Sequence, residues 1–259
     1  MIALAQSPAA DETVHRWRAF AVLAVSYFMT IVDLTIVNVS LPTIGRALHF
    51  SESNLQWIVT AYAITFGGFL LLGGRAADLL GRRRILMAGL AIFTAASLGA
   101  GLAPNDGLLI GMRALQGFGA AVVLPAALSI VMNMFAEGAE RNKALGLWGA
   151  IGAFGATFGL IAGGLLTRYA GWEYIFFLNV PVGAAALLFT PRIVPESRLT
   201  GVRRRYDPLG AVTVTGGLLL LVYTISKAPQ AGWGSIRGAS SSPATPTGTL
   251  RKKMYSHPT

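Results

Sequence analysis

The 259-residue sequence contains no cysteine and only three histidines. The absence of cysteine excludes disulfide bonds and thiol chemistry. The histidines, His15, His49 and His257, are far apart and lie outside the apolar runs, so no metal site is expected. No nucleophile is accompanied by a base and an orienting group, so the sequence predicts neither an enzyme nor a bound cofactor.

Charged residues are also scarce. They make up 12% of the sequence, against roughly 25% in soluble domains, whereas hydrophobic residues make up 54%. This balance indicates a membrane protein. A net charge of +10 is a feature of nucleic-acid-binding proteins too, but the placement of the charges argues against a nucleic acid partner.

Seven apolar runs are each near the ~20 residues that a helix needs to cross the hydrocarbon core. They predict an all-α membrane protein: a six-helix amino-terminal bundle, one additional transmembrane helix and a disordered tail. Prolines, including Pro42 and Pro191, are expected at span ends. The expected spans are residues 19–41, 55–72, 85–103, 108–135, 144–166, 175–190 and 209–226. The expected division is a cytoplasmic segment (1–18), the bundle (19–190), a basic cytoplasmic loop (191–208), the seventh helix (209–226) and a loop with the tail (227–259).

Positive residues gather in alternate loops. Two arginines, Arg46 and Arg168, lie in the opposite set of loops. By the positive-inside rule the amino terminus is therefore cytoplasmic, the chain crosses the plasma (inner) membrane several times, and anionic lipid headgroups are its expected surface partners. The cations of the first set are Arg16, Arg18, Arg75, Arg82, Arg83, Arg84, Arg141, Lys143, Arg192, Arg198, Arg203, Arg204 and Arg205.

Two charged residues lie within the expected spans, Asp33 in the first and Arg113 one turn into the fourth. A charge at bilayer depth costs at least ~2.5–3.5 kcal/mol, so each should face a cavity or a partner. An aspartate that takes up and releases a proton is a usual element of proton coupling, and an arginine stays charged beside it. Two alternatives remain open: Asp33 forms only a helix-packing hydrogen bond, or Arg113 snorkels to the interface.

Two uncharged polar residues are further candidates for lining a cavity. Gln116 shares a helical face with Arg113 and extends its polar stripe. Asn38, near the outer end of the first span, suits a cavity role and a helix-packing hydrogen bond equally. In the fifth span, glycines recur every three or four residues and predict close packing against another helix. They are Gly149, Gly152, Gly155, Gly159 and Gly163.

The polar segment 73–84, GGRAADLLGRRR, lies between the second and third spans. Its length and composition predict a tight loop joining two membrane helices, and its four arginines place it in the cytoplasm.

Four separated signatures occur in the order found in the major facilitator superfamily, and the chain resembles its branch of 14-span drug:proton antiporters. D-x-T-I-V-N-V-A-L-P is matched at Asp33, Thr35, Ile36, Val37, Asn38, Val39, Leu41 and Pro42, with Ser40 for alanine. G-x-L-A-D-R-x-G-R-K is matched at Gly74, Ala77, Asp78, Gly81 and Arg82, with Arg83 for lysine, Ala76 for leucine and Leu79 for a basic residue. R-x-x-Q-G-x-G-A-A is matched at Arg113, Gln116, Gly117, Gly119, Ala120 and Ala121. G-x-x-x-G-P-x-x-G-G is matched at Gly155, Gly159, Gly163 and Gly164, with Leu160 for proline.

The resemblance implies proton-coupled multidrug efflux by two six-span halves that rock about a site at the midplane. Asp33 and Arg113 would form the proton relay, and the substrate would be a lipophilic or cationic small molecule. The implied cytoplasmic latch is Gly74, Asp78, Gly81, Arg82 and Arg83, and the implied helix-packing antiport motif is Gly155, Gly159, Gly163 and Gly164.

The resemblance ends at about Ile236, where a stretch rich in Ser, Thr, Pro, Gly and basic residues is typical of disorder. We therefore expect an incomplete copy that lacks the second six-span bundle. Two alternatives remain open. One is a non-transporting membrane remnant, or a subunit that pairs with a second half-transporter. The other is a proton-coupled exporter of a metabolite.

Overall fold

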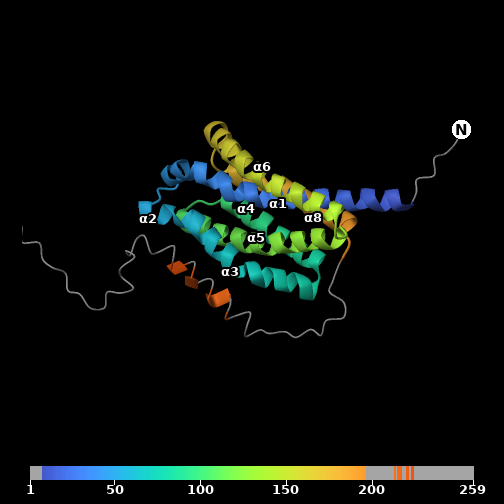
Figure 1. Ribbon diagram of the computed structural model, residues 1–259. Helices are drawn as coiled ribbons and strands as arrows, with labels where there is room; N and C mark the ends of the chain where they lie inside the picture. Colours follow the sequence, from blue (N-terminus) through green and yellow to red (C-terminus); the bar gives the residue numbers. More distant parts are fainter. Residues whose placement is uncertain (1–7, 197–212, 214, 218–219, 222, 225–259) are drawn as a thin grey trace, which may run out of the picture.

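The structure, a computed structural model, describes residues 8–196, 213, 215–217, 220–221 and 223–224 (Figure 1). In that part of the chain all regular structure is helical. Six helical segments are long and apolar enough to cross a membrane, the sixth being α7 and α8 together. The expected six-helix bundle is therefore present. The helices are α1 (Pro8–Ala47), α2 (Glu52–Leu55), α3 (Trp57–Leu80), α4 (Arg82–Gly101), α5 (Asp106–Met134), α6 (Ala139–Tyr169), α7 (Tyr174–Phe177) and α8 (Asn179–Ile193).

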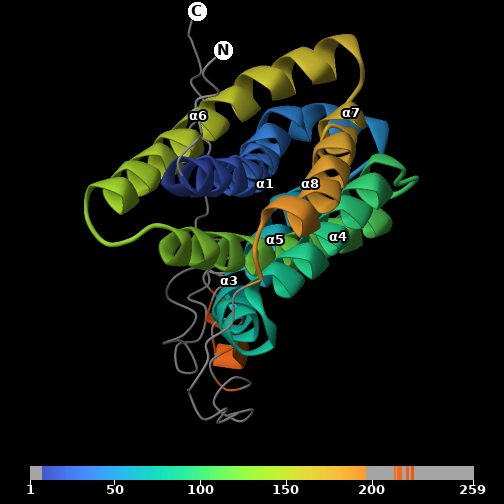
Figure 2. The same ribbon diagram turned by 90° about the vertical axis from the view of Figure 1, so that its right-hand side faces the viewer.

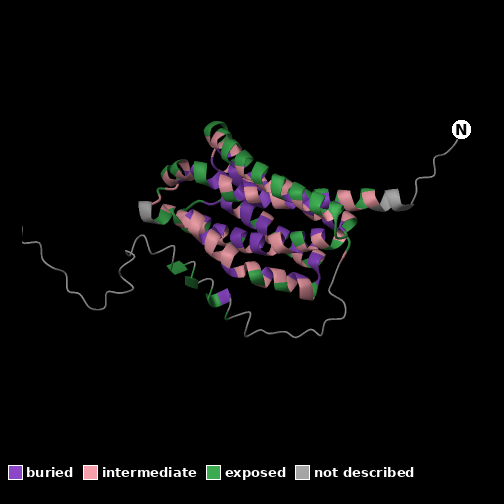
Figure 3. Ribbon diagram, viewed as in Figure 1, coloured by how far each residue is buried: buried purple, intermediate pink, exposed green. Residues whose placement is uncertain are grey.

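Helix α5 is the centre of the bundle. It packs along α3 and α4, while α1 packs along α6 and α8 contacts both α1 and α4 (Figures 1 and 2). Buried residues concentrate on the facing sides of α1, α4 and α5, and α6 is mostly exposed apart from its contact with α1 (Figure 3). The apolar outer surface is the one that a bilayer covers.

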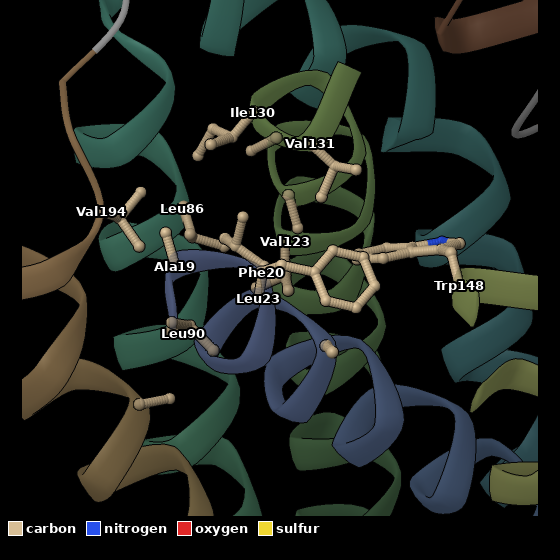
Figure 4. Close-up of a cluster of buried hydrophobic side chains, with 14 of the residues drawn as sticks. Ala19, Phe20, Leu23, Leu86, Leu90, Val123, Ile130, Val131, Trp148 and Val194 are labelled. Atoms are coloured by element: carbon tan, nitrogen blue, oxygen red, sulfur yellow. The ribbon is translucent and has the colours of Figure 1, made fainter. Parts of the chain in front are cut away.

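The interior holds two apolar clusters, one toward each end of the bundle. In the first, Phe20 and Leu23 of α1 pack among side chains of α4, α5 and α6, including Leu90, Val123 and Trp148 (Figure 4). The second gathers around Ile36, Ile58, Leu109 and Phe176. On each helix, the residues that lie between its contributions to the two clusters are therefore in the middle of the bundle.

The basic loops come together at one end of the bundle. The start of α1, the α3–α4 turn, the α5–α6 connection and the end of α8 all lie there (Figure 1). Arg16 and Glu140, separated by 3.4 Å, join the starts of α1 and α6. Arg83 Nη1 donates to the carbonyl of Val194 at 3.1 Å and so joins the start of α4 to the end of α8. One end of the bundle is thus strongly basic.

The expectation that residues 73–84 form a loop is wrong. Helix α3 continues to Leu80 and α4 begins at Arg82, so Gly81 alone separates them. Gly81 has φ 110°, a left-handed conformation that glycine adopts without the strain of a Cβ. The other residues of the segment continue their helices because a helix forms its backbone hydrogen bonds within itself and does not require apolar side chains.

Other helix ends differ from the expected spans. Pro42 lies inside α1 and Pro191 inside α8, so neither proline ends its helix. The sixth span is divided at Leu178 into α7 and α8. Of the expected seventh helix, the residues that are described are helical, and the Tyr223 ring lies 6.3 Å from that of Trp57. The expected tail, 227–259, lies outside the described residues.

Candidate functional site

A buried ion pair lies in the middle of the bundle. Arg113 Nη1 of α5 is 2.6 Å from Asp33 Oδ2 of α1, with side-chain exposures of 1% and 0%. Arg113 is two turns into α5, which begins at Asp106, rather than one. It does not snorkel to the surface, and the two charged residues that stood apart in the sequence are each other's partners.

The second oxygen of Asp33 is also occupied. Asp33 Oδ1 accepts a hydrogen bond from Gln116 Nε2 at 3.1 Å and another from Asn179 Nδ2 at 2.7 Å. Asn179 is the first residue of α8 and is 2% exposed. One carboxylate therefore holds donors from α5 and α8 against α1.

Arg113 has further partners on α5 and α3. Its Nη1 donates to Gln116 Oε1 at 2.9 Å and its Nε to the backbone carbonyl of Ile58 at 3.1 Å. The guanidinium carbon lies 4.4 Å from the ring centroid of Tyr62, a cation–π distance. The contacts to Ile58 and Tyr62 bring α3 into the network, so the charge is satisfied on several sides.

Ser97 of α4 completes the network. Its hydroxyl accepts from Gln116 Nε2 at 2.8 Å and donates to the backbone carbonyl of Phe93 at 2.8 Å. The network of Asp33, Arg113, Gln116, Asn179 and Ser97 thus joins α1, α4, α5 and α8, and it forms a polar layer between the two apolar clusters.

The two charges of this layer compensate one another. In the paired state both charges are neutralised by one another and by hydrogen bonds, which is the condition under which buried ions are tolerated. A proton on Asp33 would remove the negative charge and leave Arg113 uncompensated at bilayer depth. The loss of either charge is therefore expected to be costly.

Sequence reasoning identified Asp33, Arg113 and Gln116 but missed Asn179 and Ser97. Both are polar residues within apolar runs, which is the signal that could have selected them. Asn179 also lies in the segment GWEYIFFLNVPVG that follows the fifth span. Serine is so often bonded to its own helix that Ser97 carried little signal.

Asn38 does not join the polar layer. It is exposed on α1, and its Nδ2 donates to the carbonyl of Leu34, one turn earlier on the same helix, at 3.0 Å. It therefore forms no helix-packing hydrogen bond. Gln116, the other cavity candidate, is fully buried in the layer.

The candidate latch residues lie around the α3–α4 turn. Asp78 Oδ1 accepts from Arg82 Nε at 3.1 Å and from Arg82 Nη2 at 2.9 Å across the turn at Gly81. Gly74 lies within α3, where an added Cβ would be 3.4 Å from the ring of Pro125 in α5. Arg83 faces a different partner, since its backbone N–H donates to Glu196 Oε1 at 3.2 Å. These residues thus contact different partners rather than forming one cluster.

The glycines of α6 lie against α1. A Cβ at Gly155 would be 3.1 Å from Phe28, one at Gly159 2.9 Å from the carbonyl of Val32, and one at Gly163 2.7 Å from the carbonyl of Ile36. Gly164 is at the edge of this contact, 3.9 Å from Val39. At Gly149 a Cβ would meet nothing within 4 Å, so the predicted stripe is shorter than its sequence pattern.

The chain is similar to known membrane proteins. The family model of the Major Facilitator Superfamily matches residues 23–250. The puromycin resistance protein pur8 of Streptomyces alboniger is 45% identical over 219 residues, which are 85% of this chain and 43% of that protein. For the cephamycin export protein CmcT of Amycolatopsis lactamdurans the identity is 39%, over 83% and 45% of the two chains. The tetracenomycin C resistance and export protein of Streptomyces glaucescens is 34% identical, over 90% of this chain and 43% of that protein.

This chain therefore spans less than half the length of these relatives. Among solved structures, a peptide transporter POT in complex with sulfate is similar with a TM-score of 0.62 at 17% identity, over 85% of this chain and 48% of that one. At that identity the likeness concerns the fold. The family match, the six-helix bundle and the ordered motifs agree that this multi-pass membrane protein belongs to the Major Facilitator Superfamily.

Proposed function

We propose that the chain forms the amino-terminal half of a proton-coupled exporter of drug-like small molecules. The observation that carries the proposal is the buried ion pair of Asp33 and Arg113 within the polar layer. The relatives named above, which are resistance and export proteins, support the choice of a drug-like small molecule. That the substrate is lipophilic or cationic is part of the proposal. The basic end of the bundle supports a plasma-membrane orientation with the amino terminus in the cytoplasm.

In this proposal Asp33 is the proton site and Arg113 its charge partner. Uptake of a proton neutralises the carboxylate, weakens the bonds from Gln116 and Asn179, and frees Arg113 to find another acceptor. Since Asn179 is the link from α8 to α1, the change loosens the contact between those helices. Proton movement is thereby coupled to the rocking that exposes a substrate site.

A second half is needed to close the cavity, and we propose that it is another six-span bundle that pairs with this one. Large apolar side chains exposed on α6, Phe154, Ile161 and Leu165, offer a face for it. The α3–α4 turn with Asp78 and Arg82 would act as the cytoplasmic latch between the halves.

The test is flux into liposomes that contain the purified 259-residue chain and have an acidic lumen. Ethidium is a suitable probe because its permanent charge prevents passive accumulation by pH. The wild type should accumulate it, Asp33→Asn should lose the pH-dependent part, and the exposed-site control Asn38→Ala should retain it. Equal flux by Asp33→Asn would reject the proton role, and absence of wild-type flux would favour the non-transporting alternative.

Crosslinking in the same liposomes tests the pairing. Active liposomes should contain crosslinked dimers if two copies make the transporter. Flux from a population that remains monomeric would contradict the need for a second half. Flux of a polar metabolite in place of ethidium would favour the metabolite exporter.

A further inference from the structure

An apolar groove runs between α1 and α8 on the outside of the bundle. The two helices lie side by side (Figure 2). The groove has a volume of about 280 Å³ and lies away from the polar layer. Its walls are carbon, and three of its six lining residues are alanines, whose short side chains leave the space open. The lining residues are Ala21, Val22, Val25, Ala185, Ala186 and Phe189.

Each wall of the groove continues into an arginine at the basic end of the bundle. On α1, Arg18 precedes Ala21 by three residues and Val25 by seven, which places all three on one helical stripe. On α8, Arg192 follows Phe189 by three residues and Ala185 by seven, so it continues the opposite wall in the same way.

The two arginines lie at the same end of the groove because the helices are antiparallel. Helix α1 begins, and α8 ends, at the basic end of the bundle (Figure 1). Each arginine therefore lies about one helical turn, or about 5 Å, beyond the last lining residue of its own wall. The apolar groove therefore has one arginine on each side of its end at the basic end of the bundle.

Two carboxylates near this end of the bundle, Glu140 and Glu196, pair with arginines other than Arg18 and Arg192. Glu140 pairs with Arg16 at 3.4 Å, on the side of α1 that faces α6. Glu196 lies 3.8 Å from Arg83 and 3.7 Å from Arg84. Arg18 and Arg192 are both exposed and, within the described residues, form no salt bridge; Arg192 Nη1 donates to the carbonyl of Leu188 at 2.6 Å. Both guanidinium groups retain donors for an anion.

We propose that this groove is a binding site for an anionic phospholipid, with one acyl chain along the alanine walls and the phosphate between Arg18 and Arg192. The apolar lining excludes a free anion as the sole occupant, and the two cations favour an anionic over a zwitterionic headgroup. Basic pockets between transmembrane helices bind anionic lipids for this reason. The site depends on the membrane fold and is independent of the proposed transport.

Native mass spectrometry of the full chain tests the site, with dioleoylphosphatidylglycerol and dioleoylphosphatidylcholine as probes. The wild type should retain the anionic lipid more strongly. The double variant Arg18→Gln/Arg192→Gln should weaken its apparent affinity by about tenfold or more, since each basic residue near an anionic headgroup contributes on the order of 1 kcal/mol.

Three matched variants separate this site from general attraction. Lys143→Gln removes one charge at the same end but on α6, and it should leave the preference unchanged. Arg18→Lys/Arg192→Lys keeps both charges and should retain most of the preference for the anionic lipid. This expectation holds whether or not the glutamine variant folds. Ala185→Leu narrows the groove at an exposed position without removing charge, and it should weaken binding of the anionic lipid.

Equal retention of the two lipids by the wild type would overturn the proposal. So would an undiminished preference in a folded Arg18→Gln/Arg192→Gln variant, because the anionic lipid would then bind elsewhere. The proposal would also be overturned if Arg18→Gln/Arg192→Gln weakened binding of the anionic lipid while Ala185→Leu had no effect. The two arginines would then bind the headgroup without any acyl chain in the groove.

Discussion

Arg113 Nη1 lies 2.6 Å from Asp33 Oδ2, although the two residues are 80 positions apart in the chain. Each charge would be costly alone at bilayer depth, and each is the other's nearest opposite charge. The contact therefore joins α1 to α5 by a pair of mutually compensating charges.

Replacing one residue of this ion pair should destabilise the protein more, per residue changed, than replacing both. Asp33→Asn and Arg113→Gln should each lower the free energy of unfolding by about 3–5 kcal/mol, because each leaves one buried charge unpaired. The double variant should lose clearly less than the sum of the two. Denaturant unfolding in mixed micelles measures all three, and strictly additive losses would show that the residues are not coupled.

The free energy of unfolding should depend on the side-chain amide of Asn179 much more than on that of Asn38. Asn179→Leu should cost about 1–2 kcal/mol because Asp33 loses a buried donor. Asn38→Ala should stay within about 0.5 kcal/mol because its side chain is exposed and bonds only to its own helix. The same unfolding measurement compares them. A loss at position 38 as large as that at 179 would contradict the placement of Asn38 outside the polar layer.

Two glycines of α6 should give opposite signs when changed to alanine. At Gly159 the new methyl would lie 2.9 Å from the carbonyl of Val32, so the variant should lose about 1–3 kcal/mol. At Gly149 nothing lies within 4 Å, so the variant should gain about 0.5–1 kcal/mol from reduced backbone entropy in the unfolded chain. Thermal unfolding in detergent should show a fall in midpoint for the first and a rise for the second.

Arginines at the α3–α4 turn should differ by their burial. Arg82 is 5% exposed and makes two hydrogen bonds to Asp78, so Arg82→Gln should cost about 1–3 kcal/mol. Arg84 has a side chain 68% exposed and lies 3.7 Å from Glu196, so Arg84→Gln should cost less than about 0.5 kcal/mol. Raising the salt concentration should diminish the effect of the second variant more than that of the first.

Much of the fold follows from composition and spacing. The six spans of the bundle were expected from apolar runs of hydrocarbon length, and the bundle has six such helices. The helix ends were less predictable. Pro42 and Pro191 do not end their helices, and the segment around Asp78 is helical. A helix forms its backbone hydrogen bonds within itself, so it can continue past the apolar run that predicts it.

The candidate site was predicted in part for a similar reason. Asp33 and Arg113 were recognisable because an isolated charge within an apolar run is costly whatever surrounds it. Asn179 and Ser97 were not, because an amide or hydroxyl in a helix is tolerated in many settings and only its neighbours show which one applies. Gly149 shows the converse, since it follows the spacing of the glycine stripe although a Cβ at that position would meet nothing within 4 Å.

The sequence by itself determined that this chain enters a membrane as helices, since the transfer of apolar side chains and the need to satisfy backbone groups depend on local composition alone. It also determined which residues carry charge at depth. Only the tertiary structure decided that Asp33, Arg113, Gln116, Asn179 and Ser97 form one layer, because their meeting depends on how four helices rotate and cross. The packing of side chains far apart in sequence controls that geometry.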